Sequence, residues 1–137
     1  MKSYVFDAGA LVAFFNDEDG AEVVENLLAK ASQGRCSIFM NKYNLLEVYY
    51  GYLRANGEKF AEGIMSIVED SCINIYDVLT DELFRKAGNF KVNYNVSLAD
   101  SMALAQAFVE QAPLVTTDHH EMDAVEKDGQ VGFLWVR

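Results

Sequence analysis

The chain has 137 residues, of which 51% are hydrophobic and 23% are charged. This length suits one domain with a buried core, and the composition excludes a disordered chain. The formal net charge is −10, from 21 acidic and 11 basic side chains. That charge argues against a protein that binds nucleic acid without a cation or a partner, because Lys and Arg contacts to phosphate supply most of the non-specific affinity for nucleic acid. Nucleic acid would have to be approached through bound cations or a basic partner.

The sequence shows no membrane or export signal. The longest stretch of apolar residues and glycine runs from Ala8 to Phe15, which is too short to cross a bilayer. Asp7 interrupts the N-terminal residues before a signal-peptide core could form. Cys36 and Cys72 match neither a zinc-site spacing nor a disulfide framework. We therefore expect a cytoplasmic protein that does not associate with membranes.

Short apolar segments alternate with segments of helical periodicity along the chain. Five strands are expected, at residues 3–6, 36–40, 72–76, 114–117 and 131–136. Cap and stop residues predict the helices between them, which follow Asp7, Asp19, Asn41, Gly57, Thr80, Ser97 and Asp118. Residues 90–96 are expected to form a loop, since asparagines stand at positions 93 and 95.

This alternation predicts an α/β fold, a three-layer α/β/α sandwich with a mainly parallel five-stranded sheet. Without a linker or repeat, we expect one domain over residues 1–137. Ligands of such sheets bind outside the carboxyl ends of the strands, where the strand order reverses. Asp7 and Asp118 directly follow strands, and Glu47 and Asp100 lie near the starts of helices that leave the same edge. The sequence therefore predicts that these four acids converge.

Each acid also has a purely structural explanation. Asp100 completes a capping box with Ser97, Asp7 and Asp118 can cap the helices that follow them, and Glu47 can be a solvated surface residue. Acids sharing one crevice would repel, however, by roughly 3 kcal/mol per pair at ~5 Å and an effective dielectric of ~20. A bound cation removes that penalty. Ligands without histidine or cysteine suit Mg²⁺ or Mn²⁺, ions that support phosphodiester hydrolysis.

Four segments, in this order, resemble a PIN (PilT N-terminus) domain. They are Asp7-Ala8-Gly9-Ala10-Leu11-Val12-Ala13, the helix of Glu47, Ser97-Leu98-Ala99-Asp100-Ser101-Met102-Ala103-Leu104-Ala105, and Leu114-Val115-Thr116-Thr117-Asp118. Within that family the chain is most similar to toxin ribonucleases of the virulence-associated protein C (VapC) type. The resemblance implies a PIN-like nuclease domain over residues 1–137 and an endoribonuclease that depends on Mg²⁺ or Mn²⁺. It also implies an RNA substrate, a homodimer and a small antitoxin whose tail enters the site.

The resemblance also assigns roles to residues. The catalytic and metal-binding quartet would be Asp7, Glu47, Asp100 and Asp118. Thr116 would be a supporting hydroxyl, and Asp123 an extra acid. The chain departs from the family pattern at Gly9, where a serine or threonine is common.

Other functions stay open from the sequence. Gly9 and the net charge suit a catalytically silent PIN-like module that binds RNA or protein. An acidic phosphotransfer protein is disfavoured because no Asp-x-Asp follows the first strand. His119 and His120 invite a zinc or general-base role, but no other histidine exists in the chain. The tyrosines of the Glu47 helix can stack on RNA bases, pack in the core or form a dimer face.

Overall fold

The computed structural model describes residues 1–137, and its centre is a five-stranded sheet. The strands are β1 (Lys2–Phe6), β2 (Cys36–Asn41), β3 (Ile73–Tyr76), β4 (Leu114–Thr116) and β5 (Phe133–Trp135). Their order across the sheet is β3-β2-β1-β4-β5, and every neighbouring pair is parallel. The mainly parallel sheet predicted from the sequence is confirmed, and it is parallel throughout.

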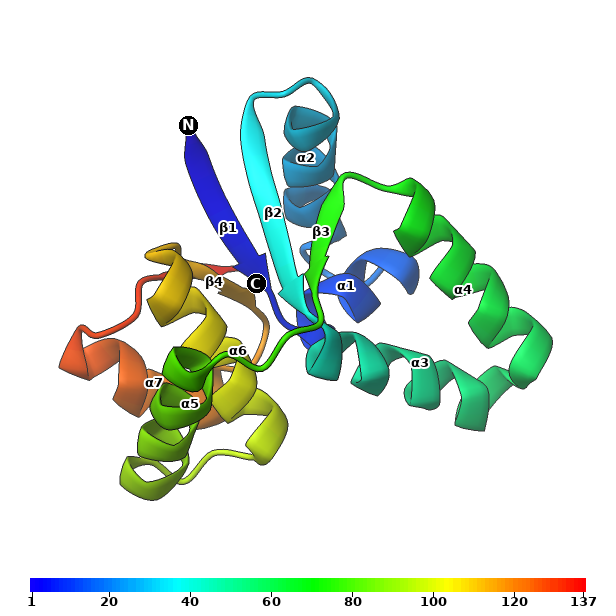
Figure 1. The fold of residues 1–137 in the computed structure, drawn as a ribbon. Coiled ribbons are helices and arrows are strands. Elements are labelled where there is room, and N and C mark those ends of the chain that lie inside the picture. The colour runs from blue at the N-terminus through cyan, green and yellow to red at the C-terminus, as the bar shows by residue number, and fades with distance from the viewer.

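Helices cover both faces of this sheet (Figure 1). One face carries α1 (Ala8–Phe15), α2 (Ala21–Ser32), α3 (Lys42–Asn56) and α4 (Glu58–Asp70), and the other carries α5 (Asp81–Asn93), α6 (Leu98–Glu110) and α7 (His119–Asp128). Each face has its own buried apolar cluster. The three-layer α/β/α fold is thereby confirmed. No helix combines the length and the apolar character needed to span a membrane.

The order of the strands reverses beside β1. The chain first moves from β1 to β2 and β3, and then returns to place β4 on the other side of β1. In register, Phe6 of β1 pairs with Val115 of β4, so the two strands end at the same level. Their carboxyl ends therefore form the reversal point at which open α/β sheets bind ligands.

Helix α6 is the most deeply buried helix. Its residues from Ser101 to Ala107 are all buried, on every side of the helix rather than along one stripe. Alanines at 103, 105 and 107 let the helix lie close to β1 and β2. Ser97 caps its start, since the Asp100 N–H donates to the Ser97 hydroxyl oxygen at 3.1 Å. The predicted capping is confirmed here, and it holds the first turn of α6 in place.

Two sequence-based expectations about helices are wrong. The predicted loop at 90–96 begins only after Asn93, because Phe90 is 1% exposed and packs in the core while α5 continues past it. The N-cap of α2 is Gly20 rather than Asp19. Gly20 has a φ of 90°, and a Cβ there would lie 2.2 Å from the Val136 carbonyl oxygen. Glycine is needed at this position for both reasons.

Candidate metal and catalytic site

Asp7 stands at the junction of β1 and α1 and is only 5% exposed. One carboxylate oxygen accepts a hydrogen bond from the Ala10 N–H at 2.9 Å, which caps α1, and the other accepts one from the Thr116 hydroxyl. Burial raises the pKa of Asp7 from 3.8 to about 6, against the opposing effect of these two hydrogen bonds. Asp7 is thus held rigidly in an environment that disfavours its charge.

Thr116 is fully buried at the end of β4 and contacts two of the predicted acids. Its hydroxyl donates to Asp7 and accepts the Asp118 backbone N–H at 3.2 Å. The structure therefore places this predicted supporting hydroxyl between the two acids that follow the central strands.

Gly9 follows Asp7 in the first turn of α1, and its neighbour in space is Thr117. A Cβ built on Gly9 would lie 2.9 Å from the Thr117 hydroxyl oxygen and 3.4 Å from a carboxylate oxygen of Asp7. The Thr117 hydroxyl therefore occupies the space that a larger residue at position 9 would take. The hydroxyl that contacts Asp7 comes from Thr116, at the end of β4.

Asp100 lies in the first turn of α6 and is partly buried. Burial, followed by contact with the Glu121 carboxyl, raises its pKa from 3.8 to about 8. The same contact lowers the pKa of Glu121, in the direction opposite to the shift of Asp100. The side chains of Asp100 and Glu121 are therefore close to each other, although they come from different helices.

Asp118 and Glu121 come from one short segment. Asp118 caps α7 by accepting the Glu121 N–H at 3.3 Å. Oxygen atoms of Asp100, Asp118 and Glu121 all lie within 4.8 Å of one another, close enough to share one ion. Sequence reasoning missed Glu121, although Asp-His-His-Glu has the spacing of a capping box, which brings the fourth residue beside the first.

The predicted extra acid, Asp123, is not part of this group. Its side chain is 66% exposed and lies 3.4 Å from a ring nitrogen of His119. Two residues beyond Glu121 on α7, it points to another side of the helix, because residues two apart do not share a face. Of these two acids on α7, Glu121 is the one whose carboxylate lies near those of Asp100 and Asp118.

Glu47 reaches the same region from α3 and is partly buried. Burial raises the pKa of Glu47, and contact with the Asn44 amide acts in the opposite direction. Together with Asp7, Asp100 and Asp118, it lines a cleft of about 380 Å³ at the carboxyl ends of β1 and β4. The other lining residues are Ala8, Gly9 and Thr117. The structure therefore brings all four predicted acids to one cleft, and no Lys or Arg lines it.

The histidines after Asp118 do not enter this cleft. The His119 ring stacks on Trp135 with centroids 3.8 Å apart, and its Nε2 lies 2.8 Å from the Arg137 carbonyl oxygen. The available donors in the cleft are therefore carboxylate and hydroxyl oxygens, which fit Mg²⁺ or Mn²⁺ better than zinc.

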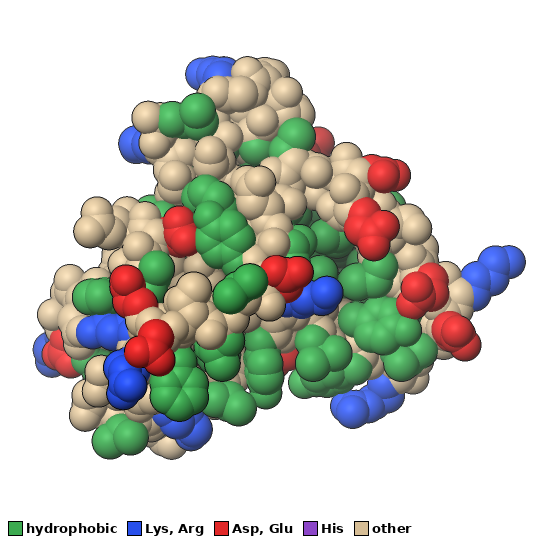
Figure 2. All heavy atoms as spheres, viewed as in Figure 1, with side chains coloured by type: hydrophobic (Ala, Val, Ile, Leu, Met, Phe, Trp, Pro, Cys, Tyr) green, Lys and Arg blue, Asp and Glu red, His purple; other side chains and the backbone are tan.

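A larger, mainly apolar groove of about 770 Å³ lies beside the acidic cleft and contains none of its acids. Its walls include Tyr43, Phe84, Val92 and Leu98 from α3, α5 and α6. Hydrophobic side chains gather over these elements along the lower part of Figure 2. This groove offers few ligand groups for a cation.

Comparisons with known proteins agree with this geometry. Residues 4–128 match the family model of the PIN domain. The solved structure of VapBC2 from Rickettsia felis, bound to a DNA fragment from its promoter, is similar with a TM-score of 0.73 and 17% identity, covering 96% of this chain and 97% of that chain. DNA-bound VapBC from Salmonella typhimurium gives a TM-score of 0.69 and 16% identity, covering 100% of both chains.

A third similar structure is VapC20 of Mycobacterium tuberculosis, described as a toxin that cleaves the sarcin-ricin loop. It gives a TM-score of 0.64 and 16% identity, covering 88% of this chain and 94% of that chain. At such identities these structures share the fold with this chain, and the match says nothing more. No curated protein sequence matches the chain.

Proposed function

The chain belongs to the PIN domain family, and on that basis we propose that residues 1–137 form one nuclease domain that hydrolyses RNA phosphodiesters with the help of Mg²⁺ or Mn²⁺. One observation carries this proposal. Carboxylates from four separate segments, after β1, in α3, at the start of α6 and after β4, line a single cleft that has no basic residue. Such a collection of like charges is costly unless a cation binds there.

Asp100, Asp118 and Glu121 would hold the cation, and Asp7 and Glu47 line the same cleft as Asp100 and Asp118. When bound, a divalent ion supplies a water of lowered pKa and neutralises charge on the phosphate. The protein's own residues orient these ligands. Thr116 and the Ala10 N–H hold the carboxylate of Asp7. Helix capping holds the backbone of Asp100 and the side chain of Asp118.

We further propose a role as the toxin of a toxin–antitoxin pair. The Rickettsia felis and Salmonella typhimurium structures that share this fold are VapBC proteins. The net charge of −10 would suit a basic antitoxin, because opposite charges speed association and favour the correct partner. A homodimer is also proposed, and exposed apolar side chains such as Phe84 and Val92, 58% and 84% exposed, support burial against another protein surface.

Incubation of the purified chain with structured RNA tests the proposed activity. We expect cleavage with Mg²⁺ or Mn²⁺ and none with chelator. Asp100→Asn should abolish cleavage, whereas Asp123→Asn, an exposed acid outside the cleft, should cut like the parent protein. Cleavage by Asp100→Asn at the parental rate would overturn the mechanism. Calorimetry that detects no Mn²⁺ binding would favour the catalytically silent module instead.

A further inference from the structure

Helix α3 presents one buried stripe to the rest of the molecule, made of Asn44, Val48 and Tyr52. These residues stand four apart and therefore lie on one side of the helix. Only the middle member is wholly apolar, and Glu47 lies next to it in the chain. The residues at both ends of the stripe, Asn44 and Tyr52, make hydrogen bonds to other elements. Hydrogen bonds have defined directions, so they fix the position of the helix more specifically than apolar packing does.

At the first end, the Asn44 amide nitrogen donates to the Ala99 carbonyl oxygen at 2.9 Å. Ala99 lies in the first turn of α6 and immediately precedes Asp100. The amide has one defined orientation, because a carbonyl oxygen can only accept a hydrogen bond. Asn44 thus links the helix of Glu47 directly to the turn that carries Asp100.

An asparagine at position 44 is unfavourable for the stability of the folded protein. It is 1% exposed, and its side-chain oxygen is the one buried side-chain polar atom without a hydrogen-bond partner. An apolar residue of similar size would fill the same space without leaving a buried polar atom unpaired. Packing alone therefore does not explain an asparagine here.

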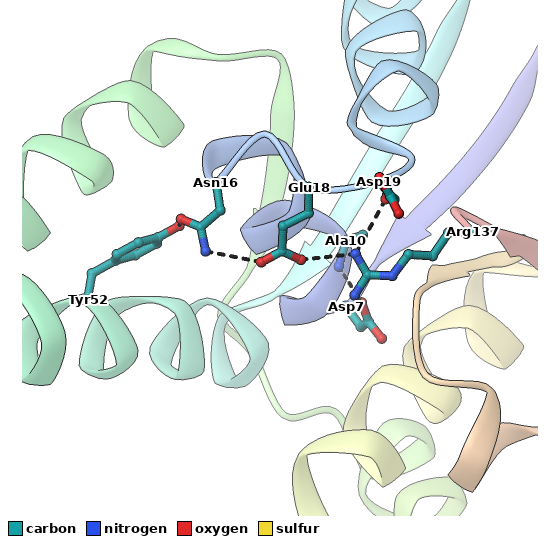
Figure 3. A network of polar contacts seen from close by, with 7 residues as sticks. All are labelled: Asp7, Ala10, Asn16, Glu18, Asp19, Tyr52 and Arg137. Carbon is teal, nitrogen blue, oxygen red and sulfur yellow. Dashed lines mark hydrogen bonds and ion pairs between the residues drawn. The ribbon is translucent and has the colours of Figure 1, made fainter.

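At the second end, the Tyr52 hydroxyl donates to the Asn16 side-chain oxygen at 2.7 Å (Figure 3). Asn16 directly follows α1, the helix that Asp7 caps. The Asn16 amide in turn donates to Glu18 at 3.3 Å, and Glu18 pairs with Arg137 at 3.0 Å. Tyr52 therefore anchors the far end of the stripe to the segment after α1, away from the cleft.

Part of the apolar surface of α3 does not pack against the rest of the protein. The α3 and α4 helices extend away from the sheet in Figure 1, and Leu46 and Leu53 of α3 remain 50% and 38% exposed. A second amide contact, from Asn41 to Gln106 at 3.0 Å, also joins the start of α3 to α6. Two buried amides, Asn44 and Asn41, thus link the start of α3 to α6.

We propose that Asn44 is a positioning residue of the acidic cleft. Its amide holds the first turn of α3 on the first turn of α6, and so sets the separation between Glu47 and Asp100 at which both face one divalent cation. This inference rests on the proposed metal-dependent function. Asn44 does not line the cleft, so its role is to position Glu47 and Asp100 rather than to bind the cation.

Calorimetric titration of the full chain with Mn²⁺ tests this role. Asn44→Leu should weaken Mn²⁺ binding by about tenfold or more, the usual effect of losing a residue that orients a metal ligand. Val48→Ala is the matched control, since Val48 lies in the same stripe and is equally buried. It should lower the unfolding temperature in chelator while leaving Mn²⁺ affinity unchanged. If Asn44→Leu does not fold, Asn44→Ala is titrated in the same way, with the same expected loss.

A double-mutant cycle separates positioning from general damage. If Asn44 acts through Glu47, Asn44→Leu should cause no further loss of Mn²⁺ affinity in the Glu47→Gln background. An equal loss in both backgrounds would overturn the inference. Parental binding by the Asn44 variants would overturn it as well, while leaving the proposed nuclease intact. Failure of the unaltered chain to bind Mn²⁺ would overturn the proposed function and this inference together.

Discussion

The hydroxyl of Thr116, at the end of β4, donates a hydrogen bond to the buried carboxylate of Asp7, at the end of β1. The same oxygen accepts the backbone N–H of Asp118. One threonine therefore joins two acids that are far apart in sequence, across the pair of strands where the sheet order reverses. Removing the Thr116 hydroxyl would therefore affect the positions of both Asp7 and Asp118.

Thr116→Val keeps the shape of the side chain and removes the hydroxyl. Because the hydrogen bond lowers the pKa of Asp7, its loss should raise that pKa further and leave the Asp118 N–H without its acceptor. We expect Mn²⁺ affinity to fall by about 10–100-fold in calorimetry, as for other residues that orient metal ligands. Thr116→Ser keeps the hydroxyl and should bind almost as tightly as the parent. Parental affinity in Thr116→Val would show that the hydroxyl does not organise the site.

The raised pKa of Asp7 predicts the pH dependence of stability without metal. The folded state favours the protonated carboxyl of Asp7. The contribution of Asp7 to the free energy of unfolding is therefore fully present below pH 3.8 and is lost as pH rises through about 6. A pKa of about 6 in place of 3.8 corresponds to about 3 kcal/mol lost by neutral pH. The pKa of Asp100 is also raised, to about 8, so the loss of stability should continue to higher pH.

Denaturant unfolding in chelator at pH 5 and pH 7.5 measures this effect. The parent should be more stable at pH 5, and Asp7→Asn should be less dependent on pH because it cannot ionise. Added Mg²⁺ should oppose the loss at pH 7.5, since an ion that binds only the folded state stabilises it. A parent protein that gains stability from pH 5 to pH 7.5 in chelator would contradict the burial of an ionisable Asp7.

The pair Glu121→Gln and Asp123→Asn tests which acid of α7 belongs to the site. Both variants remove one charge from the same helix, but only Glu121 lies with Asp100 and Asp118. We expect Glu121→Gln to lose at least about tenfold in Mn²⁺ affinity, or about 1.4 kcal/mol. Asp123→Asn should lose only its exposed contact with His119 and bind normally. The reverse result would restore Asp123 as the extra acid.

Gly9→Ala tests the close approach of Thr117. A Cβ at position 9 would lie 2.9 Å from the Thr117 hydroxyl oxygen, whereas a Cβ at Gly63 on α4 meets nothing within 4 Å. Gly63→Ala should therefore stabilise the protein by about 0.5–1 kcal/mol, the usual gain from alanine within a helix. Gly9→Ala should not show that gain, because the β-branched Thr117 side chain has to move. Thr117→Ala in the same protein should restore it, and equal gains at both glycines would refute the steric conflict.

The elements that could be predicted are those with strong local signals. Asn41, Thr80 and Ser97 cap helices as expected, because a side-chain oxygen two or three residues before a free N–H is a short-range interaction. The predictions were wrong where contacts with residues distant in the sequence determine where a helix begins or ends. Helix α5 continues past Phe90 because the ring of Phe90 packs in the core. Gly20 rather than Asp19 is the N-cap of α2, and the backbone of Val136 lies close to Gly20.

The sequence by itself determined the alternation of strands and helices, and with it the sheet edge to which Asp7, Glu47, Asp100 and Asp118 would come. That inference needed only topology, since parallel strands place their carboxyl ends together. Only the tertiary structure decided that Glu121 rather than Asp123 lies near Asp100, that Thr116 contacts Asp7, and that Asn44 contacts Ala99 beside Asp100. These contacts join residues from different elements. Their distances depend on how helices pack on the sheet, which spacing along the chain does not encode.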